Sequence, residues 1–172
     1  MTGLRLRPPR PEDESQVLAG HWAMLAADGF PFALGYEPGM SWNTYLRALE
    51  FNRVGTNLPA GYVAATFLVA VDGDRIVGRA SLRHRLNESL ERQGGHIGYG
   101  VLPEHRRRGY ATEILEQSLV VARALGIDRV LVTCDDANTA SAGVIERCGG
   151  KPDSVIASAD LPGLMIRRYW ID

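Results

Sequence analysis

The stretch Val101-Leu-Pro-Glu-His-Arg-Arg-Arg-Gly-Tyr-Ala-Thr112 decides the fold of this chain. It predicts a strand that ends at Pro103, a basic turn, and a helix that opens at Gly109. The first amides of a helix have no intrahelical partner and carry the positive end of the helix dipole. Glycine lets a ligand approach the backbone, and arginine adds a charged fork. The stretch therefore predicts a site for a phosphorylated cofactor.

The sequence on either side of this stretch predicts alternating strands and helices, with no repeat and no linker. A hairpin is expected around Asp72-Gly73-Asp74, and a polar loop at residues 87–95. Together these patterns predict a mixed α/β sheet with helices on its faces. The expected strands are residues 4–7, 65–71, 75–82, 97–102, 127–134, 155–159 and 164–170, and the expected helices open at Pro11, Ser41, Gly109 and Asn138.

Length and composition are those of an ordinary globular domain. The 172 residues are 45% hydrophobic and 23% charged, so we expect one domain over residues 1–172. The net charge is −1 and the chain has no extended basic stripe, so no nucleic-acid partner is expected. No apolar stretch has the length of a membrane span or follows a basic leader, so no membrane partner is expected either.

The cysteines, Cys134 and Cys148, stand outside any CxxC pair and outside any histidine spacing typical of a metal site. Their apolar surroundings predict buried thiols. We therefore expect no metal cofactor, and a reducing, cytoplasmic environment fits this usage.

The motifs of this chain resemble those of the GNAT superfamily of acetyl-CoA-dependent N-acetyltransferases. The family hallmark, Arg/Gln-x-x-Gly-x-Gly/Ala between the fourth strand and the third helix, is matched by Arg106-Arg107-Arg108-Gly109-Tyr110-Ala111. The preceding Val101-x-Pro103-x-x-Arg106 and the later Asn138-x-x-Ser141 also match. The resemblance covers nearly the whole chain and is strongest at residues 96–150. It implies a GNAT-like mixed, mostly antiparallel central sheet of about six or seven strands with helices on both faces.

The resemblance also implies how the chain binds acetyl-CoA, its acetyl donor. The amides and side chains of residues 106–112, from Arg106 to Thr112, would hold the pyrophosphate. Tyr99 and Val101, at the splayed end of the fourth strand, would pair with the pantetheine like an added strand. An amide near Val101 would stabilise the thioester oxyanion. Asn138 and Ser141 would face the thiol, although Asn138 is equally well explained as a helix cap.

The catalytic base is a point where the chain departs from the family. The glutamate that the family often places on the fourth strand corresponds here to about Gly95, which has no side chain. His96 is adjacent and titrates in the useful range, so we predict that it acts as the base, directly or through water. The alternative is a histidine that only forms hydrogen bonds within the sheet.

The catalytic acid is a second departure. The family's tyrosine on the helix after the fifth strand corresponds to Ile145, which cannot donate a proton. Ser141 is the predicted replacement, with a water molecule or unassisted departure of the thiolate as alternatives. Tyr99 and Tyr169 are further candidate donors, although tyrosines on strands are more often packing residues.

The region between the first two helices shapes acceptor choice in the family. Asp28, Glu37 and a set of aromatic residues would suit a pocket for a cationic amine. The alternative is that these residues anchor the two helices to the sheet. Arg83, His84 and Arg85 are similarly ambiguous. The aromatic set is Phe30, Phe32, Tyr36, Trp42 and Tyr45.

The function that these patterns favour is N-acetylation of a primary amine of a small molecule or peptide, by direct attack on acetyl-CoA. The alternative is a module that binds acyl-CoA without turnover, as a sensor or regulator. An enzyme that uses ATP or a dinucleotide is not favoured, because the chain has no GxxxxGK[ST] and no GxGxxG between a strand and a helix. We also expect a homodimer, with the C-terminal strands as a candidate edge.

Overall fold

The structure is a computed structural model that describes residues 3–172, and its centre is a seven-stranded sheet in the order β1-β2-β3-β4-β5-β7-β6. Neighbouring strands are antiparallel except β4 and β5, which are parallel. The strands are β1 (Arg5–Arg7), β2 (Ala65–Asp72), β3 (Arg75–Arg83), β4 (Ile97–Val101), β5 (Val130–Asp135), β6 (Lys151–Ala157) and β7 (Met165–Ile171). The helices are α1 (Glu14–Asp28), α2 (Trp42–Val54), α3 (Glu88–Arg92), α4 (Tyr110–Ala124) and α5 (Thr139–Arg147), with 3-10 turns at Pro11–Asp13 and Pro103–His105.

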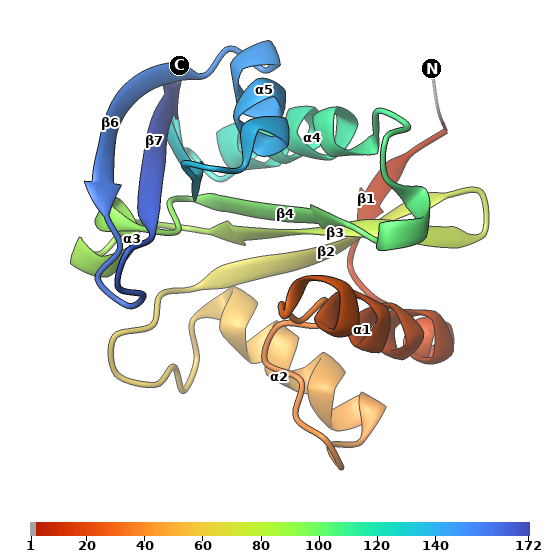
Figure 1. The fold of residues 1–172 in the computed structure, drawn as a ribbon. Coiled ribbons are helices and arrows are strands. Elements are labelled where there is room, and N and C mark those ends of the chain that lie inside the picture. Colours follow the sequence, from red (N-terminus) through yellow and green to blue (C-terminus); the bar gives the residue numbers. More distant parts are fainter. Residues whose placement is uncertain (1–2) are drawn as a thin grey trace.

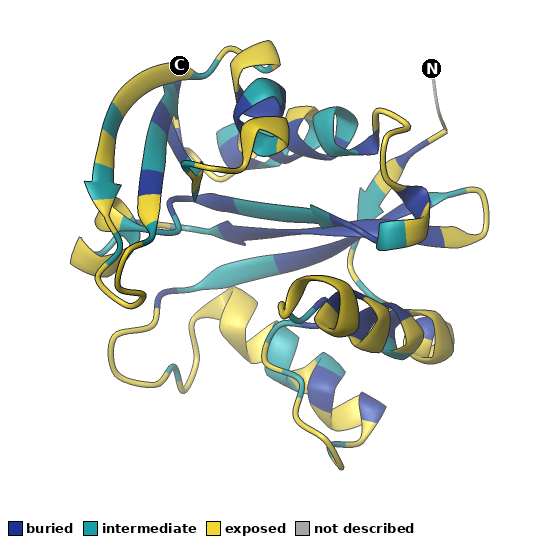
Figure 2. Ribbon diagram, in the orientation of Figure 1, coloured by how far each residue is buried: buried dark blue, intermediate teal, exposed yellow. Residues whose placement is uncertain are grey.

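Helices cover both faces of the sheet: α1 and α2 lie on one face, and α4 and α5 lie on the other (Figure 1). Each face has its own apolar cluster. Leu68, Ile97 and Ile114 belong to the cluster under α4 and α5, whereas Val69 and Tyr45 belong to the one under α1 and α2. Figure 2 shows buried residues concentrated on the central strands and on the inner sides of the helices. The fold class expected from the sequence is confirmed.

Local signals in the sequence correctly place the starts of three helices. Ser41 Oγ accepts a hydrogen bond from Thr44 N (3.2 Å) at the start of α2. Asn138 Oδ1 accepts one from Ser141 N (3.0 Å) at the start of α5. Gly109 precedes α4 with a left-handed φ of 85°. Ser41 and Asn138 each satisfy an amide of the first helical turn, whereas Gly109 has no side chain and leaves the first amides of α4 without a cap.

Three expectations differ from the structure. The expected loop at residues 87–95 contains α3, which begins where Asn87 Oδ1 accepts from Leu90 N (2.9 Å). Strand β6 begins at Lys151 rather than residue 155, and as an edge strand it tolerates the proline at 152. Cys134 and Cys148 are half-buried free thiols rather than fully buried ones. Because β6 lies at the edge, it remains the candidate dimer strand, and the homodimer stays a prediction.

The start of β4 is pressed against β5. His96 N donates to Leu131 O (2.8 Å), and Gly95 has a left-handed φ of 62°. A Cβ atom at Gly95 would lie 2.4 Å from Leu131 O, which is closer than atoms can approach. Any side chain at this position would therefore require the backbone of β4 or β5 to shift.

No helix within residues 3–172 has both the length and the apolar character needed to cross a bilayer.

Substitution of Gly95 by alanine tests this close approach. We expect Gly95→Ala to lower the free energy of unfolding by about 2–5 kcal/mol, from the left-handed φ and the clash together. Gly126→Ala is the matched control, because Gly126 has a φ of 81° and open space around its Cβ position. The control should cost only about 1 kcal/mol. Equal losses in urea unfolding would contradict the proposed contact.

Candidate functional site

A groove opens where β4 and β5 separate. The two strands pair only at Ile97 and Val132, and beyond this point they diverge. The resulting groove has a volume of about 920 Å³ and runs between β4, the β4–α4 loop, the end of β5 and the first turns of α5. The residues predicted to bind acetyl-CoA and the predicted base and acid all line it except His96 and Arg108.

The N-terminus of α4 presents a row of free amides to this groove. Arg107 has a φ of 62° and Gly109 a φ of 85°, so the backbone turns twice through the left-handed region. Within residues 3–172, no hydrogen bond engages the amide nitrogens of residues 107–111. Such consecutive unpaired amides at a helix start form a concave anion site.

The edge of β4 that faces the groove has no strand partner beyond Ile97. The other edge bonds to β3: Leu102 N donates to Val77 O (2.9 Å), and His96 O accepts from Arg83 N (2.7 Å). Because peptide groups alternate along a strand, the amides of Tyr99 and Val101 point the other way, into the groove. An extended ligand with amide groups could pair with this edge as an added strand.

Tyr99 and Ser141 meet across the groove. Tyr99 OH and Ser141 Oγ are 2.8 Å apart, and either atom can be the donor. Burial raises the pKa of Tyr99 to about 12, so its hydroxyl is protonated at neutral pH. The half-buried thiol of Cys134, whose pKa is raised by burial, contacts the same serine. These side chains form a neutral polar cluster between β4 and α5.

The side chain of Arg106 is committed to other parts of the protein. Its Nη1 atom donates to Asp28 Oδ1 (3.1 Å), its Nη2 pairs with Asp28 Oδ2, and its Nε donates to Val101 O (3.1 Å). The guanidinium therefore ties the β4–α4 loop to the end of α1. It holds the loop amides in place, and its own N–H groups already donate to Asp28 and Val101.

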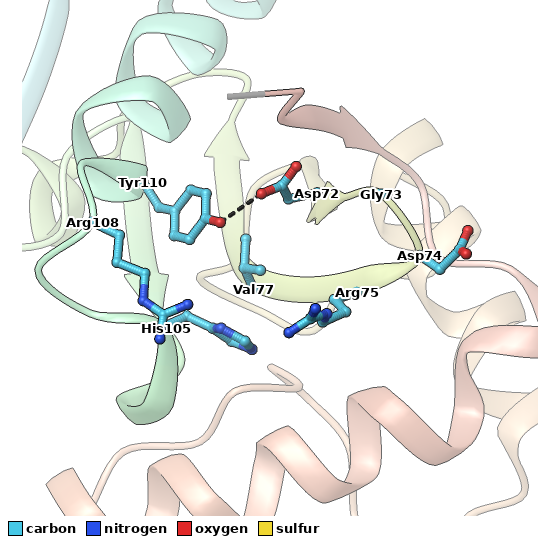
Figure 3. Close-up of a pocket in the computed structure, with 8 residues that line it drawn as sticks. All are labelled: Asp72, Gly73, Asp74, Arg75, Val77, His105, Arg108 and Tyr110. Carbon is cyan, nitrogen blue, oxygen red and sulfur yellow. Dashed lines mark hydrogen bonds between the residues drawn. The ribbon is translucent and has the colours of Figure 1, made fainter. Parts of the chain in front are cut away.

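The side chain of Arg108 lies in a second, smaller cavity of about 390 Å³. Figure 3 shows Arg108, Arg75 and His105 around this space, which is bounded by the hydrogen bond from Tyr110 OH to Asp72 Oδ2 (2.6 Å). Arg108 thus directs its charge into this cavity rather than into the groove.

His96 lies in the sheet rather than in the groove. Its ring is buried, and Nδ1 accepts a hydrogen bond from Leu131 N (2.9 Å). Burial, and then the nearby Arg83, lower the pKa of His96, so the ring is neutral. A neutral ring whose Nδ1 is an acceptor carries its proton on Nε2. The catalytic role of His96 stays a prediction, and it would require breaking the bond to Leu131.

Most of the residues considered for the acceptor pocket anchor the helices instead. Phe32, Trp42 and Tyr45 are buried between α1, α2 and the sheet. Of that set, Asp28 and Phe30 line the groove, whereas Glu37 is exposed outside it. Tyr169, considered as a donor, is buried, and its hydroxyl donates to Glu146 Oε1 (3.0 Å) rather than facing the groove.

Arg79 is a groove residue that the sequence analysis did not identify. Arg79 of β3 is only 3% exposed and lines the groove beside Gly100. The signal in the sequence was an arginine in the interior of β3, between Ile76 and Leu82, where a buried charge is rare.

Comparisons with known proteins agree with this architecture. A family model described as an acetyltransferase (GNAT) domain matches residues 3–151. A search of curated proteins gave no match to this chain.

Solved structures similar to the chain include three with CoA ligands, all at identities where the likeness shows the fold alone. RimJ from Mycobacterium smegmatis, in complex with CoA-disulfide, has a TM-score of 0.71 at 18% identity, covering 98% of this chain and 81% of that one. Spermidine N-acetyltransferase from Vibrio cholerae, with CoA and spermine, has a TM-score of 0.66 at 18% identity, with coverages of 98% and 94%. The putative acetyltransferase yncA from Salmonella typhimurium, with acetyl-CoA, has a TM-score of 0.67 at 14% identity, with coverages of 98% and 93%.

The neutral state of His96 predicts a pH dependence of stability. The pKa of His96 in the folded protein lies below the ordinary histidine value of about 6.5, so the unfolded chain binds more protons in this pH range. This contribution to stability is complete above about pH 6.5 and is lost as the pH falls through the lowered folded pKa. We expect urea unfolding between about pH 7.5 and pH 5 to show a smaller loss for His96→Asn than for the wild type.

Asparagine is the appropriate replacement because its amide oxygen can accept from Leu131 N and does not titrate. His21 and His84 also have lowered pKa values and contribute equally to both proteins, so the difference between the two curves reports His96. Parallel curves would show that the imidazole is not held neutral.

Proposed function

The chain belongs to the acetyltransferase (GNAT) family, and on that premise we propose that it transfers the acetyl group of acetyl-CoA to a primary amine by direct attack of the amine. Direct transfer requires the two reactants to be held in line, and positioning supplies much of the rate. The acceptor is a small molecule or the amino group of a peptide.

The free amides at residues 107–111 are the observation that carries this proposal. They suit a pyrophosphate, because they combine unpaired donors with the positive end of the α4 dipole. Several relatives of the same fold were solved with CoA or acetyl-CoA, which supports the same ligand here. When bound, acetyl-CoA supplies the activated thioester.

Different residues of the groove would bind different parts of acetyl-CoA. Residues 107–111 hold the pyrophosphate through their amides. The free edge of β4 pairs with the amide groups of the pantetheine, since an exposed strand edge accepts an extended partner. The amide of Val101 donates to the carbonyl oxygen on which negative charge develops during attack.

Tyr99 and Ser141 would stabilise the departing thiolate. The pKa of Tyr99 is about 12, well above that of a thiol, which is about 8.5 for cysteine. Tyr99 therefore acts by hydrogen bonding and does not release its proton fully. Ser141, bonded to the same hydroxyl, relays or shares this donation. Asn138 contributes by capping α5, which fixes Ser141 at the groove.

The proton on the attacking amine leaves through water or through His96. His96 can accept it only at Nδ1, at the expense of the bond from Leu131 N. A catalytic role predicts that His96→Asn loses the acidic limb of the kcat/KM profile. If the imidazole has only a structural role, the shape of the profile is retained.

The alternative function is binding of acyl-CoA without turnover. It is favoured by Gly95 and Ile145 at the positions where the family often carries its base and acid. Turnover of acetyl-CoA with a panel of amines separates the two functions, because a sensor binds acetyl-CoA and leaves it unchanged.

Blocking the groove tests the cofactor assignment. Gly143 faces the groove from α5 and has an ordinary helical backbone, and a Cβ atom there would meet only Arg147 Nη1, at an ordinary contact distance of 3.6 Å. We expect Gly143→Phe to weaken acetyl-CoA binding in calorimetry by at least about 100-fold, because the ring occupies the ligand's space. Val120→Phe on the exposed face of α4 is the control and should bind normally. Equal binding of ATP and acetyl-CoA by the wild type would overturn the assignment.

Removing the hydroxyl groups tests the chemistry. Tyr99→Phe and Ser141→Ala should each lower kcat by about 10–100-fold and leave acetyl-CoA affinity nearly unchanged. Because the two hydroxyls act as one pair, the double variant should lose little more than either single variant. An unchanged kcat in both variants would exclude this role.

A further inference from the structure

Arg79 is a buried cation without a counter-ion. Its Nε atom has no hydrogen-bond partner, and its Nη2 atom makes only a long contact to Pro31 O (3.4 Å). Within residues 3–172, no ion pair includes Arg79 or Arg83. A guanidinium removed from water without a partner is costly, so such a group is expected to have a ligand.

Arg79 lies on the face of the sheet that α1 covers, beside Gly100 of β4. We call this face of β4 the acceptor side. Arg79 pairs in register with Gly100, and Tyr99 between the glycines points to α5 on the opposite face. A Cβ atom at Gly100 would lie 3.3 Å from Met24 Cε and 3.9 Å from Arg79 Cζ. Glycine thus keeps open the space between β4, α1 and the guanidinium. This space belongs to the same groove as the amide of Val101.

The electrostatic character of this side is positive. Arg83 lies on the same face of β3 and uses Nη1 to donate to Gly94 O (3.2 Å). Burial, and then the proximity of Arg83, lower the pKa of Arg79 to about 10, so it remains charged at neutral pH. Two carboxylates line the groove: Asp28 is engaged by Arg106, and Asp135 stands at the end of β5. Within the described residues 3–172, neither of them forms an ion pair with Arg79.

Phe30 covers the guanidinium. The centre of its ring lies 5.4 Å from Arg79 Cζ, and the residue itself is 54% exposed, in the segment after α1. An exposed ring can rotate without disturbing the core, so it can admit a ligand to Arg79 and then pack against its apolar part.

We propose that the acceptor is a small primary amine that carries a carboxylate, and that Arg79 binds this carboxylate while the amine meets the thioester beside Val101. The inference rests on the proposed acetyltransferase function and narrows its substrate class. The planar guanidinium fork matches a carboxylate with paired hydrogen bonds, which a lysine cannot reproduce. The same positive charge disfavours polyamines, in contrast to the Vibrio cholerae relative that was solved with spermine.

Matched acceptors test the proposal directly. We would measure kcat/KM for acceptors that differ in the carboxylate. Leucine and β-alanine carry it, leucinamide and β-alaninamide replace it with an amide, and isoamylamine lacks it. Spermidine serves as a polyamine. In the wild type, kcat/KM for the carboxylates should exceed that for their amides by at least about 100-fold, the size expected when a buried charge is left unpaired. In Arg79→Gln this ratio should fall to about one, whereas acetyl-CoA affinity should change by less than about threefold. Arg79→Lys, which keeps the charge and loses the fork, should retain part of the preference.

Arg75→Gln is the matched control, because it removes the same charge from the same strand at an exposed position outside the groove. It should leave the preference for carboxylates intact.

Arg79→Gln should not lower Tm, because it removes an unpaired buried charge, and a fall in Tm would contradict the assignment. In the presence of CoA, leucine or β-alanine should raise the Tm of the wild type and leave that of Arg79→Gln unchanged.

The outcomes distinguish this inference from the function on which it rests. Turnover of amides or spermidine as fast as carboxylates would overturn the inference and leave the acetyltransferase function standing. Absence of turnover together with absence of any carboxylate-dependent Tm shift would also overturn it. Failure to bind acetyl-CoA at all would remove the proposed function and the inference with it.

Discussion

The contact between β4 and β5 is a single parallel pair, Ile97 with Val132, and the rest of the site depends on it. The strands are held at this end because Gly95 and His96 lie directly against Leu131. A full parallel ladder would have satisfied the amides of Tyr99 and Val101. Since the strands separate instead, those amides remain free for a ligand, and the space between them becomes the groove. The start of β4 is therefore bonded to β5, and the end of β4 keeps free amides that a ligand can bind.

Two sources of positive charge stand on different walls of this groove. The N-terminus of α4 offers backbone donors, which are fixed by the loop geometry and require no particular side chain. Arg79 offers a guanidinium, whose burial without a partner costs stability. The ion pair between Arg106 and Asp28 joins the two walls, because it connects the loop before α4 to the end of α1. This ion pair adds to the packing of α1 against Leu102, which precedes the same loop.

The similar structures share the frame of this protein while differing widely in sequence. Identities of 14–18% accompany TM-scores of 0.66–0.71, so the sheet and its helices persist while side chains change. Binding through backbone amides tolerates this variation, since an amide is present whatever the residue. The acceptor recognition that we propose uses the side chains of Arg79 and Phe30, so it belongs to the part of the site in which such proteins can differ.

The sequence by itself determined the features that depend on neighbouring residues. The start of α4 at Gly109, the caps at Ser41 and Asn138, and the hairpin at Asp72-Gly73-Asp74 follow from local backbone preferences. The apolar periodicity, read together with the motif, also gave the sheet and its layers. Only the tertiary structure decided which side chains face the groove, because strand register and sheet face set those directions. It paired Tyr99 with Ser141, 42 residues away, and turned Arg108 into a second cavity. It also fixed His96 on Leu131 and left Arg79 buried without an anion, since both outcomes depend on contacts between strands distant in the chain.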